Sequence, residues 1–449
     1  MALPLDTLTI ETFARELRAG AMTSAALTEA CLQRIDAGND RLRAFTLIMA
    51  DEARTQASQA DRELAGGLDR GPLHGVPISL KDLLDVRGMP TTAASHVRDS
   101  HIAAADAPVV ARLREAGAVF VGKTNLHEFA YGTTSEESAF GAARNPLDET
   151  RTPGGSSGGS AISVATGMAL ATIGTDTGGS IRIPAAACGI IGLKPALGEV
   201  PTDGVVPLSR SLDHVGPLAR SVGDAWLVYR ALLGQHGPAR LETRKIGDLR
   251  LAVPRAYFGT LLDEDVRAAF ETALDRLRSA GAEVIDRDIA GAELTVPVYI
   301  TIASADASAY HATTLDEMPE RYAPPVRARL ELGRYILAED YVRAMRGREM
   351  LRAAVDRALA GYDALVLPTL AIPPPRIGEQ SVVVAGKTEP VRALMLRQTQ
   401  LFNLSGHPAI ALPCGRTAEG LPCSLQVVGA NTETLVQVAR ACEAALAAL

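Results

Sequence analysis

Short apolar runs alternate with segments of helical spacing between residues 73 and 197. Strands are predicted at 76–80 and 118–121, with a helix at 107–116 between them. Alternation of this kind is typical of α/β proteins in which neighbouring strands are mostly parallel. We therefore predict an α/β sheet for this part of the chain.

The flanking segments continue the pattern with a larger share of helix. The first 70 residues are predicted to be mainly helical apart from a short strand at 44–49, and a run of helices is predicted between 295 and 359. The remaining predictions are a helix at 51–65, a strand at 189–193, helices at 161–166 and 221–233, a strand–helix–strand unit at 249–254, 265–280 and 282–285, a strand at 363–368, a loop at 371–380, a helix at 394–404, strands at 409–413 and 424–428, and a closing helix at 432–449.

Composition narrows the class of protein. The chain has 449 residues, 47% of them hydrophobic, which allows a large buried core. Its formal net charge is −7 and its basic residues form no long run, which argues against nucleic acid as a direct partner. The N-terminal sequence lacks a basic region followed by a long apolar stretch, so we expect neither a signal peptide nor a membrane span, and a cytoplasmic location.

The cysteines give no sign of a metal site or a disulfide framework. Their number is odd, they are widely scattered, and none forms a C-x-x-C pair. We expect reduced core residues, no metal and no cofactor. The five are Cys31, Cys188, Cys414, Cys423 and Cys442.

Two glycine–serine clusters lie close together in the sequence, at 154–160 and 176–180. Each glycine costs roughly 0.5 to 1 kcal/mol relative to alanine inside a helix or strand, so the first cluster is predicted to be a loop. The second follows the apolar run 168–173, which indicates a strand that runs into a turn. Glycines in such a turn let backbone N–H groups converge on a bound atom, with Ser180 at the edge of this nest.

A lysine ends a third segment upstream. Lys81 follows the apolar run 76–80, which makes it a candidate for burial at a strand end. Three motifs, GVPISLKD at 75–82, GGSSGGS at 154–160 and GTDTGGSIR at 174–182, together resemble the amidase signature family. The resemblance continues at 122–126 and 138–141 and resumes at 402–410.

The resemblance implies a fold and a catalytic triad. The fold would be a large mixed, mostly parallel central sheet covered by helices on both faces, with 1–449 forming one domain. That domain would hold a helical N-terminal region at 1–70, a catalytic core at 71–230 and a variable helical substrate-pocket insert at 295–395. Lys81 would act as the base, Ser156 would relay the proton, and Ser180 would attack the substrate carbonyl.

The resemblance also assigns supporting roles. A cis peptide bond would join Gly155 to Ser156, and an oxyanion hole would contribute about 2.7 to 4 kcal/mol per donor. The oxyanion donors would be the backbone N–H groups of Thr177, Gly178, Gly179 and Ser180. Asp176 and Arg182 would hold the turn rigid from behind, Ser157 and Ser160 would brace the loop, and Ala130, Tyr131 and Gly132 would contact substrate, Ala130 through its backbone.

A lysine can serve as a base only if its pKa falls. The free side chain has a pKa near 10.4 and is almost wholly protonated at pH 7. Lowering it by about three units costs roughly 4 kcal/mol, which burial can supply. We therefore expect Lys81 to be buried and uncharged.

Two other motif matches point to different chemistry and are set aside. Residues 117–124 fit the P-loop pattern, but their middle residues are all apolar, so a strand runs inside the motif and no phosphate-binding loop can form. Residues 155–159 fit G-x-S-x-G, but the preceding 145–153 is polar and turn-like where a nucleophile elbow needs a strand. The chain also has no S-x-x-K motif.

The implied function is a serine hydrolase that cleaves the C–N bond of small-molecule amides, with anilides, esters and carbamates (urethanes) left open. One branch of the family is the A subunit of glutamyl-tRNA amidotransferase, which passes ammonia from glutamine to a partner subunit. Residues 122–160 resemble that branch, but Ile183 stands where it carries Gln. A catalytically inactive binding protein on the same fold is an alternative of another class. We expect a small-molecule amide or carbamate as partner, no nucleic acid, no membrane, and a monomer or homodimer.

Overall fold

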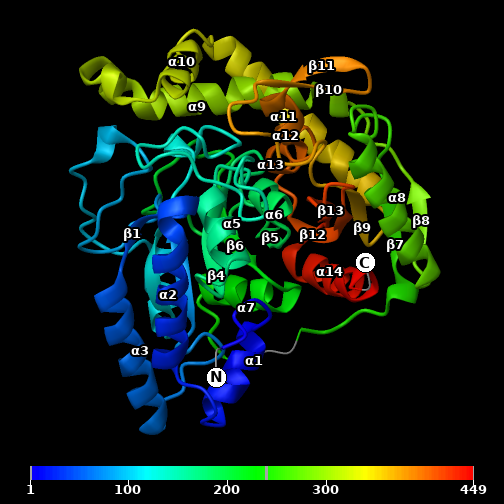
Figure 1. Ribbon diagram of the computed structural model, residues 1–449. Helices are drawn as coiled ribbons and strands as arrows, with labels where there is room; N and C mark the ends of the chain where they lie inside the picture. Colours follow the sequence, from blue (N-terminus) through cyan, green and yellow to red (C-terminus); the bar gives the residue numbers. More distant parts are fainter. Residues whose placement is uncertain (1–2, 238–240, 448–449) are drawn as a thin grey trace.

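The computed structural model describes residues 3–237 and 241–447 (Figure 1). The closing helix expected at 432–449 ends at Leu446, and residues 448–449 lie outside the described part. The α-helices are α1 Ile10–Arg18, α2 Ser24–Leu42, α3 Ala50–Ala65, α4 Pro108–Glu115, α5 Gly158–Ala165, α6 Arg182–Cys188, α7 Val222–Leu232, α8 Glu264–Ser279, α9 Thr295–Glu317, α10 Pro324–Gly333, α11 Ala338–Leu359, α12 Val391–Arg397, α13 Gln400–Leu404 and α14 Thr432–Leu446. The strands are β1 Phe45–Ile48, β2 Pro77–Lys81, β3 Val119–Thr124, β4 Ala171–Asp176, β5 Ile191–Lys194, β6 His214–Ala219, β7 Arg250–Val253, β8 Glu283–Asp286, β9 Ala364–Pro368, β10 Ser381–Val384, β11 Lys387–Pro390, β12 Ala409–Arg416 and β13 Pro422–Val428.

One large mixed sheet forms the centre of the molecule. In the described residues it has 11 strands in the order β1-β3-β2-β4-β6-β5-β12-β13-β9-β7-β8. This confirms the α/β class and the large mixed sheet. The expectation of mostly parallel neighbours is wrong, because only β3–β2, β2–β4, β9–β7 and β7–β8 are parallel. The antiparallel centre arises because β6, which the sequence analysis missed, returns beside β4, and because β12 and β13 are joined by a tight turn.

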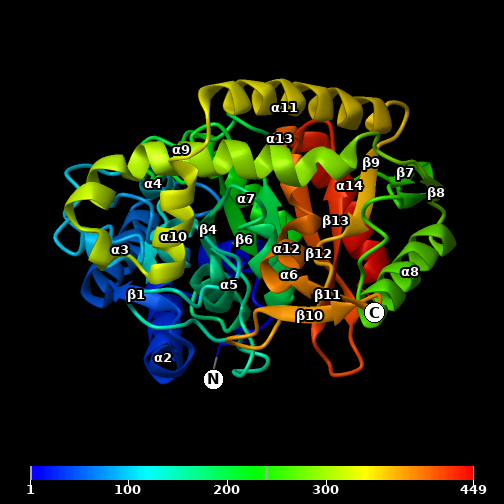
Figure 2. The ribbon, with the colours of Figure 1, turned by 90° about the horizontal axis from the view of Figure 1, so that it is seen from above.

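Helices cover both faces of the sheet, as expected (Figure 2). The alternation of side chains along β9 illustrates this, since successive residues of a strand point to opposite faces. Ala364 and Val366 join the core beneath α7, α8 and α14, whereas Leu365 and Leu367 join a second core with α11 and α13. Strands buried on both faces need apolar residues at every position, which explains the continuous apolar runs seen in the sequence.

The segment 295–395 is helical in its first two thirds and again from Val391, where α12 begins. The helices α9, α10 and α11 lie together along one side of the molecule (Figures 1 and 2). After them the chain enters the central sheet as β9 and then forms the β10–β11 hairpin. The predicted helical insert therefore also contains a sheet strand and a hairpin.

Two local expectations are corrected. The first glycine cluster is only partly a loop, because α5 begins at Gly158. Glycine is required within this helix, since a side chain at Gly159 would collide with the backbone of Ala44 and Asn125. The second cluster is followed by the short helix α6, and the single helix expected at 394–404 is two helices that break at Gln398 and Thr399.

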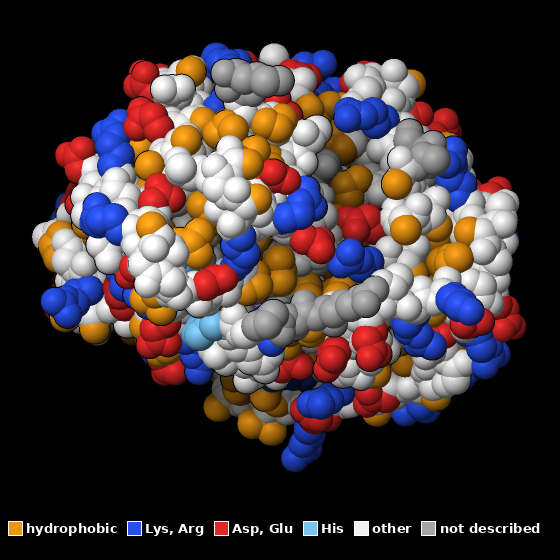
Figure 3. All heavy atoms as spheres, turned by 90° about the horizontal axis from the view of Figure 1, so that it is seen from below, with side chains coloured by type: hydrophobic (Ala, Val, Ile, Leu, Met, Phe, Trp, Pro, Cys, Tyr) orange, Lys and Arg blue, Asp and Glu red, His pale blue; other side chains and the backbone are white. Residues whose placement is uncertain are grey.

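Charged side chains of both signs are interspersed on the face shown in Figure 3. This mixed pattern matches the modest net charge of the sequence. Within 3–237 and 241–447, every helix is too short or too polar to cross a lipid bilayer.

Candidate active site

Lys81 is the last residue of β2, which lies between β3 and β4 in the parallel part of the sheet. Its side chain is fully buried. Its Nζ donates hydrogen bonds of 2.8 Å to Ser156 Oγ and 2.8 Å to Thr175 Oγ1. The end of β2 therefore places the Lys81 amine within hydrogen-bond distance of Ser156, which was predicted, and of Thr175, which was not.

Ser156 lies in the loop before α5, and a cis peptide bond joins it to Gly155. The Ser135 hydroxyl holds this loop, because it contacts the carbonyl oxygens of Gly154 at 3.0 Å and Ser156 at 3.2 Å and accepts the Gly158 N–H at 3.1 Å. A side chain at Gly155 would press against Ser135. The close packing against Ser135 thus explains the small residues on either side of Ser156.

Ser180 lies on the turn that follows β4. Its carbonyl oxygen accepts the Ser157 N–H at 3.3 Å, which joins the nucleophile turn to the Ser156 loop. Its side chain is 5% exposed, and within the described residues its hydroxyl makes no hydrogen bond. The predicted contact between the Ser156 and Ser180 hydroxyls is therefore not formed in this structure, although their loops are bonded to each other.

The backbone N–H groups of residues 177–180 bond to no acceptor in the described part of the chain. The next two N–H groups, of Ile181 and Arg182, are instead taken by the Asp176 carboxylate at 3.1 and 3.4 Å. Unpaired N–H groups on a glycine turn can receive a negatively charged oxygen. The turn therefore has the donors that an oxyanion hole needs.

Asp176 and Arg182 form a fully buried ion pair with a closest distance of 2.9 Å. Arg182 also donates to Asn403 Oδ1 and Gln426 Oε1, both at 2.6 Å, so its buried guanidinium is surrounded by acceptors. Burial alone would raise the pKa of Asp176, but the Arg182 guanidinium, together with Lys194 and Asn403, holds that pKa below its ordinary value. The pair ties the turn to α13 and β13.

Two bracing hydroxyls lie around the Ser156 loop. Ser157 Oγ donates to the Thr175 carbonyl at 3.2 Å, and Ser160 Oγ lies 2.7 Å from Thr124 Oγ1. These contacts join the start of α5 to β4 and β3. Neither hydroxyl contacts Lys81.

Burial lowers the pKa of Lys81 from 10.5 to about 7. The carboxylates of Asp176 and Asp213 act in the opposite direction. Near neutral pH a large fraction of Lys81 is uncharged and can accept a proton. The arrangement can therefore support base chemistry at Ser156.

Of the predicted substrate-contact residues, Ala130 lines a narrow hollow together with Thr175 and Thr177. Ala130 has a positive φ of 57°, and the Tyr131 hydroxyl lies 2.9 Å from Ser304 Oγ of α9. Gly132 has a structural reason to be glycine, because a side chain there would collide with the His127 ring.

Two further residues approach the glycine turn from distant parts of the chain. A side chain at Gly178 would collide with the Tyr299 hydroxyl of α9, and Thr399 Oγ1 donates to the Gly178 carbonyl at 2.5 Å. The break between α12 and α13 places Thr399 at this position. Neither residue has a local sequence signal. Asn403 had one, because it lies in the motif at 402–410.

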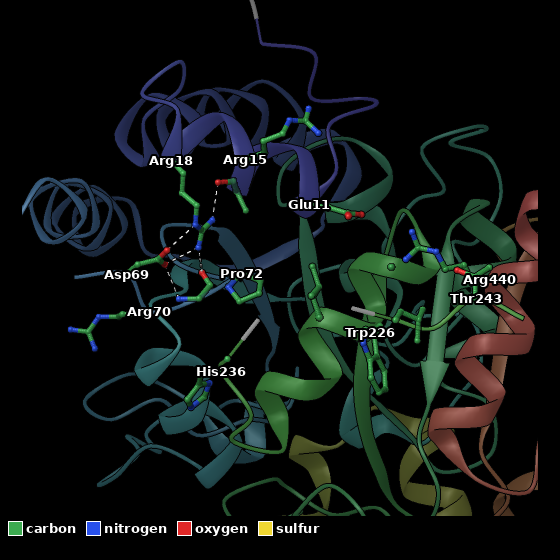
Figure 4. A pocket seen from close by; sticks show the side chains of 16 residues that line it. Glu11, Arg15, Arg18, Asp69, Arg70, Pro72, Trp226, His236, Thr243 and Arg440 are labelled. Carbon is green, nitrogen blue, oxygen red and sulfur yellow. Dashed lines mark hydrogen bonds and ion pairs between the residues drawn. The ribbon is translucent and has the colours of Figure 1, made fainter. Parts of the chain in front are cut away.

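A separate hollow of about 1150 Å³ lies between α1, α7 and the loop at 69–72 (Figure 4). Arg18 is fixed at its rim by two bonds to Asp69, of 2.8 and 2.7 Å. None of the predicted site residues lines this hollow. In 3–237 and 241–447, no three His, Cys, Asp or Glu side chains gather as a metal site would require.

The P-loop match at 117–124 has the geometry expected of a strand. β3 covers Val119–Thr124, so the apolar middle of the motif lies inside the sheet. Lys123 is buried and pairs with Asp82 at 2.7 Å. Its ammonium group is thus paired with a carboxylate of the protein and is not free to bind a phosphate.

Comparisons with known proteins agree with this site. A sequence model of the amidase family matches residues 26–434. The A subunit of glutamyl-tRNA(Gln) amidotransferase from Koribacter versatilis (strain Ellin345) is 36% identical over 487 residues, a match that covers 100% of both chains. An amidase of Pseudomonas putida is 40% identical over 431 residues, covering 93% of this chain and 91% of that protein.

A solved structure described as a crystal structure of amidase has a TM-score of 0.92 and 39% sequence identity, and the match covers 98% of this chain and 100% of that one. The match extends over nearly the whole chain in each comparison. The chain therefore belongs to the amidase family and is a hydrolase that acts on C–N bonds.

Proposed function

We propose that this enzyme hydrolyses small-molecule amides through an acyl-enzyme on Ser180, with Ser156 as proton relay and Lys81 as base. The observation that carries the proposal is the 2.8 Å hydrogen bond between a fully buried lysine amine and the Ser156 hydroxyl. Serine is a weak nucleophile without a neighbouring base. A buried lysine with a pKa near neutrality supplies one.

The reaction proceeds in two halves. Ser180 Oγ attacks the amide carbonyl as its proton passes to Ser156, and the Ser156 proton passes to Lys81. The N–H groups of residues 177–180 stabilise the tetrahedral oxyanion. The intermediate collapses when the C–N bond breaks and the leaving nitrogen takes the proton back through Ser156. Water then attacks the acyl-enzyme by the same route, which releases the acid and restores Ser180.

The substrate contacts fall to residues 130–132, with Ala130 presenting its backbone. The same chemistry extends to anilides, esters and carbamates, because each passes through an acyl or carbamoyl group on the serine. A reactive amide-like electrophile is therefore required, whereas the nature of the leaving group is not fixed by the triad.

A second candidate, hydrolysis of glutamine in the manner of the amidotransferase branch, is supported by two arginines that lie beside Tyr131. Arg329 and Arg392 lie with their Cζ atoms 5.4 and 5.6 Å from the centre of the Tyr131 ring. Both Nε atoms are buried without a hydrogen-bond partner among the described residues, and neither guanidinium pairs with a carboxylate there. Two cations beside one ring favour a substrate that brings a carboxylate.

Ile183 argues against this second candidate, since it is fully buried where the glutamine-using branch carries a polar Gln. We rank the stand-alone amidase first. Partner proteins and tRNA would be needed only under the second candidate, and the similarity to the Koribacter amidotransferase chain keeps that question open to experiment.

A substrate panel separates the two functions. Purified protein is assayed for ammonia release from butyramide, glutaramic acid and glutamine, and for product release from an anilide and an aryl carbamate. Hydrolysis of butyramide or glutaramic acid at least tenfold faster than glutamine supports the stand-alone enzyme. Efficient hydrolysis of glutamine alone would reverse the ranking, and no hydrolysis of any compound would count against the proposal. Arg392→Met should slow glutaramic acid more than butyramide if the arginines recognise a carboxylate.

A further inference from the structure

Asp213 lies immediately before β6 and faces the glycine turn at the end of β4. The pairing of β4 with β6 places Asp176 opposite His214, so Asp213 lies opposite Thr177. Its Oδ1 accepts the Thr177 hydroxyl at 2.6 Å. Thr177 is the first residue of the turn whose N–H groups are unpaired.

The same carboxylate also holds the neighbouring loop. Its Oδ2 accepts the backbone N–H groups of Leu208 at 3.0 Å and Ser209 at 3.1 Å. That loop is tied to α9, because the Ser209 hydroxyl donates to Asp306 at 2.6 Å. Asp213 therefore fixes the distance between the glycine turn and a loop that is anchored to the helical side of the molecule.

Asp213 also lines the same narrow hollow as Ala130, Thr175 and Thr177. Thr175 is the second hydrogen-bond partner of Lys81. Asp213 thus lines one hollow together with the residue that accepts the second hydrogen bond of the lysine amine. It is one of the two carboxylates whose charge acts on Lys81, the other being Asp176.

The two carboxylates differ in how far their charge is neutralised. Asp176 is paired with Arg182 at 2.9 Å. Asp213 forms no ion pair within the described residues, and its hydrogen-bond donors are one hydroxyl and two backbone N–H groups. His214, next in sequence, adds no positive charge, because burial holds its pKa well below the ordinary value. Arg210 lines the same hollow but is exposed, so Asp213 has no ion-pair partner near the lysine among the described residues.

We propose that Asp213 is a positioning residue for this reaction, which orients the oxyanion turn through Thr177 and adjusts the basicity of Lys81 through its negative charge. The inference rests on the proposed roles of Lys81 and Ser180. Asp213 would thus have a geometric effect on the turn and an electrostatic effect on Lys81, and different substitutions can remove one or the other.

Asp213 loses its proton at a lower pH than Lys81 does, as this role requires. Burial raises the pKa of Asp213 to about 6, while that of Lys81 lies at about 7. The carboxylate is therefore ionised over the range in which the lysine loses its proton. Because a nearby negative charge stabilises the protonated amine, removing that charge lowers the pKa of Lys81.

The test is the pH dependence of kcat/KM for the best substrate of the panel, measured from pH 5 to 9. Asp213→Asn should reduce the rate and move the midpoint of the acid limb to lower pH. The expected shift is roughly half a pH unit or more, because the negative charge that favours the protonated Lys81 amine is removed. Thr177→Val removes the hydrogen bond and leaves the carboxylate in place, so it should reduce the rate. The lost hydroxyl donor raises the pKa of Asp213, so the midpoint should move in the same direction as in Asp213→Asn but by less. Asp203→Asn, at an exposed position of the preceding loop, should change neither.

An Asp213→Asn enzyme that is active with a midpoint within 0.1 of wild type, a margin of about one seventh of a kcal/mol by the pKa scale, would overturn the electrostatic role. If the Asn variant does not fold, Asp213→Ser gives a second neutral side chain and Asp213→Glu retains the charge. Failure of all three to fold, with Thr177→Val folded and active, would make Asp213 a folding residue and overturn the proposal. A wild-type enzyme that hydrolyses nothing would instead count against the proposed function itself.

Discussion

Replacing Lys81 by methionine should inactivate the enzyme and stabilise the fold. Methionine has a similar length and no charge, so it can fill the space at the end of β2. The wild-type amine is held at a pKa of about 7, whereas its ordinary value is 10.5. This gap corresponds to about 5 kcal/mol by which protonation favours the unfolded chain at pH 7 and below.

Part of this gain is offset by lost hydrogen bonds. Lys81 donates to Ser156 and Thr175, and each unmade bond costs about 1 kcal/mol. We expect Lys81→Met to raise the free energy of unfolding at pH 7 by about 2 to 3 kcal/mol.

The sign of the pH dependence follows from the proton count. Between pH 7 and 10.5 the unfolded wild-type chain carries the lysine proton and the folded chain does not, so wild-type stability rises with pH across this window. The advantage of the methionine variant should therefore shrink by about 2 kcal/mol between pH 7 and 9. Below pH 7 the advantage should stay constant.

Urea unfolding followed by the fluorescence of Trp226, the single tryptophan, measures these differences at pH 6, 7, 8 and 9. Lys387→Met, at an exposed hairpin position, is the matched control and should give a difference that does not change with pH. A difference between Lys81→Met and wild type that is also flat from pH 6 to 9 would refute the argument that Lys81 is buried with a depressed pKa.

Three further outcomes are expected. Thr175→Val removes one of the two acceptors of the Lys81 amine and should slow hydrolysis at least tenfold, with the loss read from kcat; an unchanged kcat would show that Ser156 alone positions the amine. Asp176→Asn leaves the Arg182 guanidinium buried without its partner and should destabilise the protein by about 3 to 5 kcal/mol in urea unfolding, whereas a loss below 1 kcal/mol would contradict the structural importance of the pair. All five cysteines are buried, and burial raises the pKa of Cys31, Cys423 and Cys442 to about 12, so a thiol reagent at pH 8 should label none in the native protein and five after unfolding.

The site was predictable from sequence where one segment carries several of its features. The run before Lys81 indicated a buried strand end, and the glycines around Ser180 indicated a turn with free N–H groups, because both signals are local. Asp176 and Arg182 lie six residues apart, so their pairing across the turn followed from the motif.

The contributions of distant segments were not predictable in the same way. Tyr299 and Thr399 reach the site through a helix from another part of the chain and a break between two helices, neither of which leaves a local pattern. Thr175 lies in the motif at 174–182, but its contact with Lys81 depends on the pairing of β2 with β4, which the motif alone does not show. The sheet was expected to be mostly parallel because strands and helices alternate between residues 73 and 197, and β2 does pair in parallel with β3 and β4. β6 contains Gly216 and Pro217 and was not predicted as a strand, and it reverses the pairing at the centre of the sheet.

The most direct test of the central claim is the site of covalent attachment of a serine-reactive fluorophosphonate, located by peptide mass spectrometry. The account predicts one adduct, on Ser180, which is strongly reduced in Lys81→Met and in Ser156→Ala although both variants remain folded. Attachment to a different residue, or equal labelling of Ser180 without the lysine, would contradict a nucleophile activated by Lys81 through Ser156.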